Sequence, residues 1–189
     1  MEGLLARHLQ LQQPHFEANM KILSIEDAKA LLGGNSPDIF VDSIRKRIPV
    51  SAGPYAIPPD SGAKTSIARE LASLLLQDSE LFLYISGWKV WPSAEHFDLF
   101  DGYRRSLGEM RQLRDAQVHL FSPGEESTFT SVLAMSLYFV WDVQIFDARG
   151  SMLVTFSHDE WMEFRLEKAT LVQRIAEWAA DFELQPLAK

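Results

Sequence analysis

The sequence predicts an α+β fold in which helices pack on a mixed sheet, preceded by a helical extension. Short apolar runs typical of strands alternate with segments of helical periodicity, and one pair of runs is separated by a hairpin connection. Of the 21 aromatic residues, 16 lie between Leu81 and Leu166, where we expect the core. Residues 1–35 are predicted to form the extension and residues 36–189 a single α+β domain. A doubly wound α/β arrangement is the alternative.

The extension is predicted to contain two helices. A weak apolar stripe over residues 4–11 indicates the first helix, and Pro14 ends it. The second helix is expected after Ser24, because Asp27 follows at the spacing of a capping box. A pair of glycines at 33–34 then ends the second helix.

Two short strands are predicted next, at residues 39–42 and 48–51. Residues 53–62 follow, and their glycines and prolines are typical of a loop. A helix is expected after this loop, because four apolar residues share one helical face. These residues are Ile67, Leu71, Leu74 and Leu75.

The aromatic region is predicted to open with a buried strand at residues 81–86. A helix is expected to start at Ser93, with an outward ion pair between Asp101 and Arg105. The residues expected to face inward from this helix are Phe97, Phe100, Tyr103 and Leu107. A shorter strand is predicted at residues 118–121.

A well-buried helix ending near Phe139 is predicted to follow that strand. Residues 122–125 have the form of a capping box with proline at the first helical position. Residues 143–146 and 152–156 then predict a hairpin, whose connection offers Gly150 where a positive φ is useful.

Two further helices complete the predicted order of elements. Ser157 is expected to open the first, because Glu160 follows it at the capping-box spacing. The last helix is indicated by apolar residues that share one face. They are Leu171, Ile175, Trp178 and Phe182.

The charge of the chain argues against a nucleic-acid binder. Its 189 residues carry 26 acidic and 18 basic side chains, a net charge of −8, whereas binding to phosphates depends on Lys and Arg. A negative field permits a basic protein partner. The longest apolar stretches fall far below the ~20 residues of a membrane span, so we expect no membrane partner and a cytoplasmic location.

The motifs of common enzyme classes are absent from the sequence. There is no cysteine, which excludes thiolate catalysis and cysteine-based zinc sites. Residues 62–65 fail the phosphate-loop pattern, because Ala63 separates Gly62 from Lys64. No pair of histidines has helical metal-ligand spacing. The sequence predicts no catalytic residue, cofactor or metal site, and favours a protein that is not an enzyme.

Five residues remain as candidates for ligand binding. They are Trp88, Trp91, His96, His158 and Asp159. An exposed tryptophan pair stacks on a sugar, base or cation, whereas a buried pair anchors the core. Capping explains Ser157, Asp159 and Glu160 but leaves His158 unexplained. A further hypothesis is that His96, His119 and His158 converge at one site.

Several passages resemble those of small uncharacterised acidic bacterial proteins. The passages are Ser86-Gly87-Trp88, Trp91-Pro92-Ser93, Trp141-Asp142 and Ser157-His158-Asp159-Glu160. The resemblance covers about residues 81–166 and carries no catalytic residue. It implies an immunity or antitoxin role.

Three functions therefore stand as expectations. The leading one is a non-enzymatic protein of the immunity or inhibitor type that binds a basic partner. The alternative is a small enzyme or ligand-binding domain with an aromatic and histidine-lined pocket. The third is a structural subunit whose N-terminal helices mediate self-association.

Overall fold

A seven-stranded sheet organises the part of the chain that the computed structural model describes, residues 20–77, 79–88 and 95–187. The spatial order of the strands is β1-β4-β3-β5-β6-β7-β2. Their bounds are β1 (Lys21–Leu23), β2 (Ala52–Ala56), β3 (Leu81–Gly87), β4 (Val118–Phe121), β5 (Asp142–Asp147), β6 (Met152–Ser157) and β7 (Trp161–Leu166).

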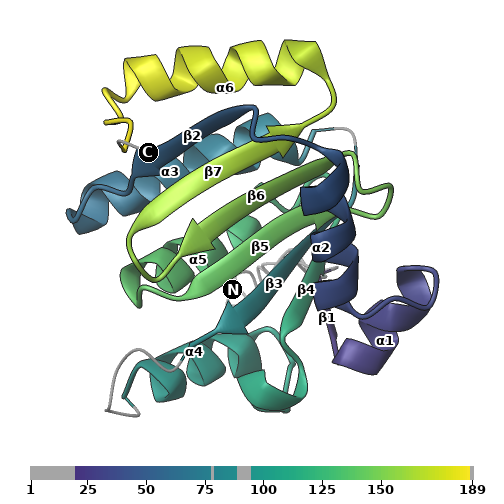
Figure 1. Cartoon of the computed structure of the whole chain (residues 1–189). Coiled ribbons are helices and arrows are strands. Elements are labelled where there is room, and N and C mark those ends of the chain that lie inside the picture. Colours follow the sequence, from purple (N-terminus) through teal and green to yellow (C-terminus); the bar gives the residue numbers. More distant parts are fainter. Residues whose placement is uncertain (1–19, 78, 89–94, 188–189) are drawn as a thin grey trace, which may run out of the picture.

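Helices cover both faces of this sheet. They are α1 (Ile25–Leu31), α2 (Pro37–Arg47), α3 (Ser61–Leu75), α4 (Glu95–Ser106), α5 (Glu126–Tyr138) and α6 (Ala169–Asp181), with a 3-10 turn at Leu113–Asp115. Figure 1 shows α3 and α5 behind the sheet, α2 in front of it, and α6 along the edge formed by β7 and β2. No helix among the described residues has the length and apolarity needed to cross a membrane.

The α+β class is confirmed, and the sheet is antiparallel at every pairing rather than mixed. Tight turns join β5 to β6 and β6 to β7, and such turns reverse the chain. Strands β3 and β4 also run antiparallel, although α4 lies between them in the sequence. A doubly wound α/β fold requires parallel strands, so that alternative is wrong.

A hydrophobic core lies between each face of the sheet and the helices that cover it. On β3, Leu81, Leu83 and Ile85 face the larger core under α3, α5 and α6, whereas Phe82 and Tyr84 face the smaller core under α1 and α2. This alternation follows from the two-residue period of a strand. The aromatic concentration forms much of both cores, as expected. Its buried members are Phe82, Tyr84, Phe100, Phe121, Phe129, Phe139, Trp141, Phe146, Phe156 and Phe164.

The segment predicted as a strand at residues 39–42 lies inside α2, so that prediction is wrong. Pro37 occupies the first turn of α2, where its missing N–H costs nothing. Val41 and Ile44 follow it at helical spacing and are buried, whereas Ile39 is exposed. The next strand, β2, begins at residue 52 and extends into the predicted loop. Its Gly53 and Pro54 are tolerated because β2 lies at the end of the strand order.

The chain before residue 36 contributes to the sheet as well as to a helix. β1 pairs with β4, which no pattern in the sequence had indicated. The capping box of α1 is confirmed: the Ser24 hydroxyl accepts a hydrogen bond from the Asp27 amide, and the Asp27 carboxylate accepts one from the Ser24 amide. The helix expected over residues 4–11 lies outside the described residues.

The helices around the larger core follow the predicted spacing with two differences. In α3 the residues Ile67, Leu71 and Leu75 are buried, as expected. In α4 the partner of Asp101 is Arg104 rather than Arg105, because Arg104 is fully buried and also donates to the carbonyl of Ala116. Helix α5 begins only at residue 126, after a turn with a positive φ at residue 124. The last helix, α6, buries Ile175 and Trp178 as predicted.

Candidate functional site

The turn between β6 and β7 brings together more of the predicted site residues than any other described segment. It consists of His158, Asp159 and Glu160, between the paired residues Ser157 and Trp161. The amide of Glu160 donates to the carbonyl of Ser157 at 3.0 Å. The prediction of a helix that starts at Ser157 is therefore wrong. Its capping-box pattern is equally suited to this turn, in which the Ser157 hydroxyl accepts a hydrogen bond from the Asp159 amide.

Glu160 occupies a backbone conformation that usually favours glycine. Its φ is +58°, in the left-handed region, as expected for the last residue of a three-residue hairpin loop. The β5–β6 turn has a glycine in the corresponding place, Gly150, with φ of +68°. A non-glycine residue in this region costs about 1–2 kcal/mol. Contacts of the Glu160 side chain and backbone must offset that cost.

Lys64 supplies one of these contacts. Its ammonium lies 3.1 Å from a Glu160 carboxylate oxygen, and its side chain is only 7% exposed, against 47% for Glu160. The carbonyl of Glu160 also accepts a hydrogen bond from the amide of Ile57 at 2.8 Å. The turn is thereby fixed to α3 and to the segment after β2. Lys64 is engaged in this pair, which accords with the failed phosphate-loop pattern around it.

Asp142, the first residue of β5, fixes the other side of the turn. One of its carboxylate oxygens accepts a hydrogen bond from the backbone amide of His158 at 2.9 Å. The Nδ1 atom of His158 lies 2.9 Å from both carboxylate oxygens. A carboxylate can only accept, so Nδ1 carries a proton. Space for this carboxylate exists because Gly87 lies opposite, and a Cβ there would collide with Asp142.

The electrostatics of the turn favour a protonated His158. The hydrogen bond that His158 donates to Asp142 and the charge of that carboxylate raise the pKa of His158, and the nearby carboxylate of Asp159 acts in the same direction. The Nε2 atom lies 3.6 Å from Asp159, whose side chain is 72% exposed. The imidazole itself is 47% exposed. The turn thus presents the cation of His158 beside the exposed carboxylate of Asp159.

The remaining candidates lie in other surroundings. His96 is buried, with its ring 5.8 Å from the ring of Trp141 and 4.1 Å from that of Phe97. Its Nε2 makes no hydrogen bond with any described residue, so ring packing accounts for its position. Trp88 is half-buried and packs against the larger core. Trp91 lies outside the described residues.

The three histidines do not form a common site. His119 is fully buried on β4 between the rings of Phe100 and Phe121, and burial lowers its pKa to about 3. His158 is exposed at the turn, and His96 packs beside Trp141. Within the described ranges, no three His, Asp or Glu side chains are grouped so as to hold a metal ion.

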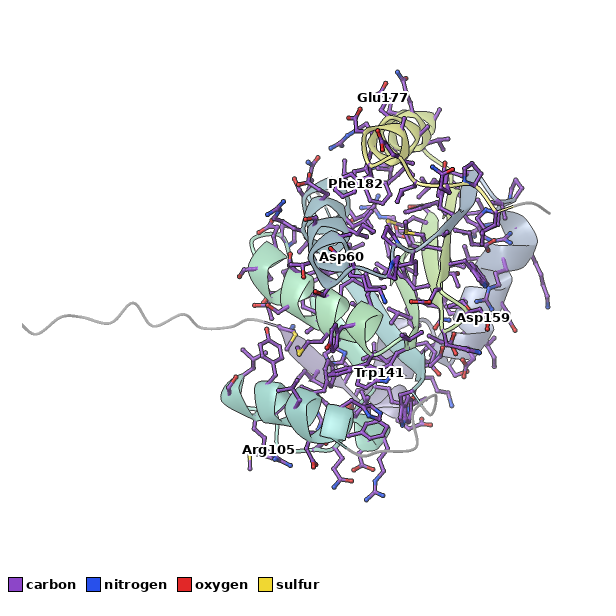
Figure 2. All side chains as sticks on the ribbon, turned by 90° about the vertical axis from the view of Figure 1, so that its left-hand side faces the viewer. Asp60, Arg105, Trp141, Asp159, Glu177 and Phe182 are labelled. Atoms are coloured by element: carbon purple, nitrogen blue, oxygen red, sulfur yellow. The ribbon has the colours of Figure 1, made fainter. Side chains whose placement is uncertain are left out.

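Sequence reasoning identified His158 and Asp159 but missed the residues that fix them. Lys64 lies three and seven positions before Ile67 and Leu71, so the buried face of α3 already contained it. Asp142 gave no such signal, because its contact with His158 depends on the register of β5 and β6. In Figure 2 the end of the sheet that carries the turn faces the viewer, with Asp159 on the right and Trp141 below it.

Comparison with known proteins adds no relative: no family model, no curated protein and no solved structure matches this chain.

Proposed function

We propose that this chain is a cytoplasmic, non-enzymatic protein of the immunity or inhibitor type. It binds a basic protein through the turn surface, defined as Asp142, His158, Asp159 and Glu160. The observation that carries the proposal is the rigid attachment of this turn. Lys64 and Asp142 hold it from two different elements, and Glu160 adopts a costly backbone conformation.

Rigid attachment favours binding because association otherwise costs the entropy of ordering a loop. Strained backbone persists only where the surroundings fix it, and it concentrates at functional positions. A hairpin that only connects two strands would do so with glycine, as the β5–β6 turn does at Gly150. Glu160 instead adds a carboxylate to the surface and fixes the direction of the two residues before it.

Charge determines the kind of partner. The net charge of −8 attracts basic proteins over long distances and increases their association rate. Asp159 is the most exposed acid of the turn surface and forms no ion pair with a Lys or Arg of the described residues. A Lys or Arg of the partner could therefore form an ion pair with Asp159. Among the described residues, the ionic neighbour of this carboxylate is His158.

A catalytic role for His158 is the second candidate, and one observation favours it. Asp142 binds Nδ1 and leaves Nε2 facing outward, as in histidines that act as general bases. Two features weigh against it. A general base must be unprotonated, whereas the raised pKa of His158 favours the protonated ring. No hydroxyl of the described residues donates to Nε2, so no nucleophile is in place for the base to activate. We therefore rank binding above catalysis.

The test is affinity capture from a lysate of the source organism at low salt. The wild-type chain is expected to recover a basic protein, released by salt, and Asp159→Lys is expected to lose it. Glu177→Lys is the matched control, because it makes the same change in net charge on α6, away from the turn (Figure 2). Recovery of no specific partner, or equal loss in both variants, would overturn the proposal.

A further inference from the structure

A cleft of about 330 Å³ opens at the end of the sheet opposite the β6–β7 turn. It is lined by the end of α3, the β5–β6 turn and the start of α6. These three segments lie on the right-hand side of Figure 1. The polar and charged residues that matter for its chemistry are Gln77, Asp147, Arg149, Ser151, Lys168 and Arg174. None of them belongs to the turn surface.

Three cationic side chains reach this cleft from three different segments. Arg149 comes from the β5–β6 turn, Lys168 from the connection between β7 and α6, and Arg174 from α6. None of the three forms an ion pair with a described residue, although the chain as a whole is acidic. Arg174 is oriented by a hydrogen bond to Gln77 at 3.2 Å. Three cations without an ion-pair partner among the described residues surround this cleft and favour a positive potential in it. Arg174 also borders a neighbouring pocket that contains Glu70, Glu177 and Asp181.

The acidic residue among the described lining residues does not neutralise these cations. Asp147 is buried, and its carboxylate accepts hydrogen bonds from the amide and hydroxyl of Ser151, both at 2.7 Å, and from the amide of Met152. These bonds hold the β5–β6 turn in shape. The carboxylate therefore serves the turn that presents Arg149, and it leaves the three cations available to a ligand.

The start of α6 adds to the positive character of the cleft. Lys168 occupies the N-cap position, immediately before the first turn of α6. An ammonium cannot accept hydrogen bonds, so the Lys168 side chain does not cap the first backbone amides of the helix. No acidic residue lies in the first turn. The hydroxyl of Ser79 and that of Thr170 also line the cleft and can donate.

We infer that this cleft binds a small phosphate-bearing molecule. Guanidinium groups match phosphate oxygens through paired hydrogen bonds, and the hydroxyls and the ammonium complete a set of donors around a tetrahedral anion. The volume suits a small molecule. A nucleic-acid polymer does not fit, because the net charge of −8 repels its backbone.

The experiment is isothermal titration of the full chain with sodium pyrophosphate and with inorganic phosphate, at constant ionic strength set with chloride. Saturable binding of one pyrophosphate is expected, together with a rise in Tm that grows with ligand concentration. Arg149→Gln and Arg174→Gln should each weaken binding about tenfold or more, the loss expected for one charge-assisted hydrogen bond.

Arg105→Gln is the matched control, because Arg105 is exposed on α4 (Figure 2) and does not line the cleft. It should leave the affinity unchanged. No saturable binding at millimolar pyrophosphate would overturn the inference, as would equal weakening in all three variants. Succinate serves as a dicarboxylate probe, and tighter binding of succinate than of pyrophosphate would overturn the assignment to phosphate.

Discussion

Gly87 and Asp142 face each other across β3 and β5, and the Asp142 carboxylate fills the space that a Cβ at residue 87 would need. The register of the two strands shifts between Ile85 and Gly87. The carboxylate accommodated here is the one that binds His158. The lack of a side chain at Gly87 therefore leaves room for the carboxylate that fixes the β6–β7 turn.

Gly87→Ala is expected to lower the free energy of unfolding by about 1–3 kcal/mol, because an added methyl group must displace its neighbours. It should also lower the pKa of His158 toward its ordinary value, since the displaced carboxylate loses contact with the ring. Urea denaturation measures the first effect and NMR titration the second. Gly102→Ala on α4 is the control. Apart from its chain neighbours and the backbone of its own helix, no described atom lies within 4 Å of a Cβ at that position, so the change should stabilise by about 0.5–1 kcal/mol. Equal stability of Gly87→Ala and wild type would contradict the packing argument.

Asp142→Asn is expected to remove a pH-dependent part of the stability. The pKa of His158 is raised in the folded state, so its contribution is fully present below about pH 6.5, the unfolded value. That contribution is lost as the pH rises through the folded pKa. The Tm difference between wild type and Asp142→Asn should therefore shrink from about pH 6 to about pH 9. A difference that grows with pH over this range would show that the pair does not act through the protonated ring.

The sequence could predict those parts of the fold whose signals are local. The β5–β6 hairpin was found because Gly150 marks its turn, and α3 because its apolar face repeats. The β6–β7 hairpin was missed because Glu160 replaces the glycine that marks such turns. The strand pattern at residues 39–42 is misleading, because Val41 and Ile44 have helical spacing and form the buried face of α2.

The candidate site was predictable only in its exposed members. His158 and Asp159 stood out because capping did not need a histidine at that place. Asp142 and Lys64 reach the turn through strand register and helix packing, which no spacing in the sequence expresses. Trp88 and His96 were conspicuous for their residue types, yet the structure uses both in packing.

Removal of the Glu160 carboxylate is expected to destabilise the chain through Lys64. The buried ammonium would lose its partner, at a cost of about 1–2 kcal/mol after allowance for the exposure of Glu160. Glu160→Ala carries this cost in full and keeps the strain of the positive φ. Glu160→Gly should be less destabilising, because glycine relieves the strain of the positive φ. Urea denaturation of the two variants compares the loss of the ion pair with the relief of backbone strain. A glycine variant less stable than the alanine variant would argue against strain at residue 160.

His119 is expected to give a pH dependence opposite in direction to that of His158. Burial lowers its folded pKa to about 3, so the unfolded chain binds a proton that the folded chain does not bind between about pH 6.5 and about pH 3. Stability therefore falls as the pH is lowered through this window, by up to about 1.4 kcal/mol per pH unit. His119→Phe should remove this dependence, because a phenyl ring suits the contacts with Phe100 and Phe121 and does not titrate.

The measurement is the free energy of unfolding of wild type and His119→Phe between about pH 7 and about pH 4. The variant should gain on the wild type as the pH falls, because only the wild type must exclude a proton from its core. His158→Gln is the control with the opposite sign, measured from about pH 9 to about pH 6.5. It should lose stability relative to the wild type as the pH falls through that range, because it removes a ring that is stabilised when protonated. Parallel curves for wild type and His119→Phe would mean that the folded chain admits the proton at His119.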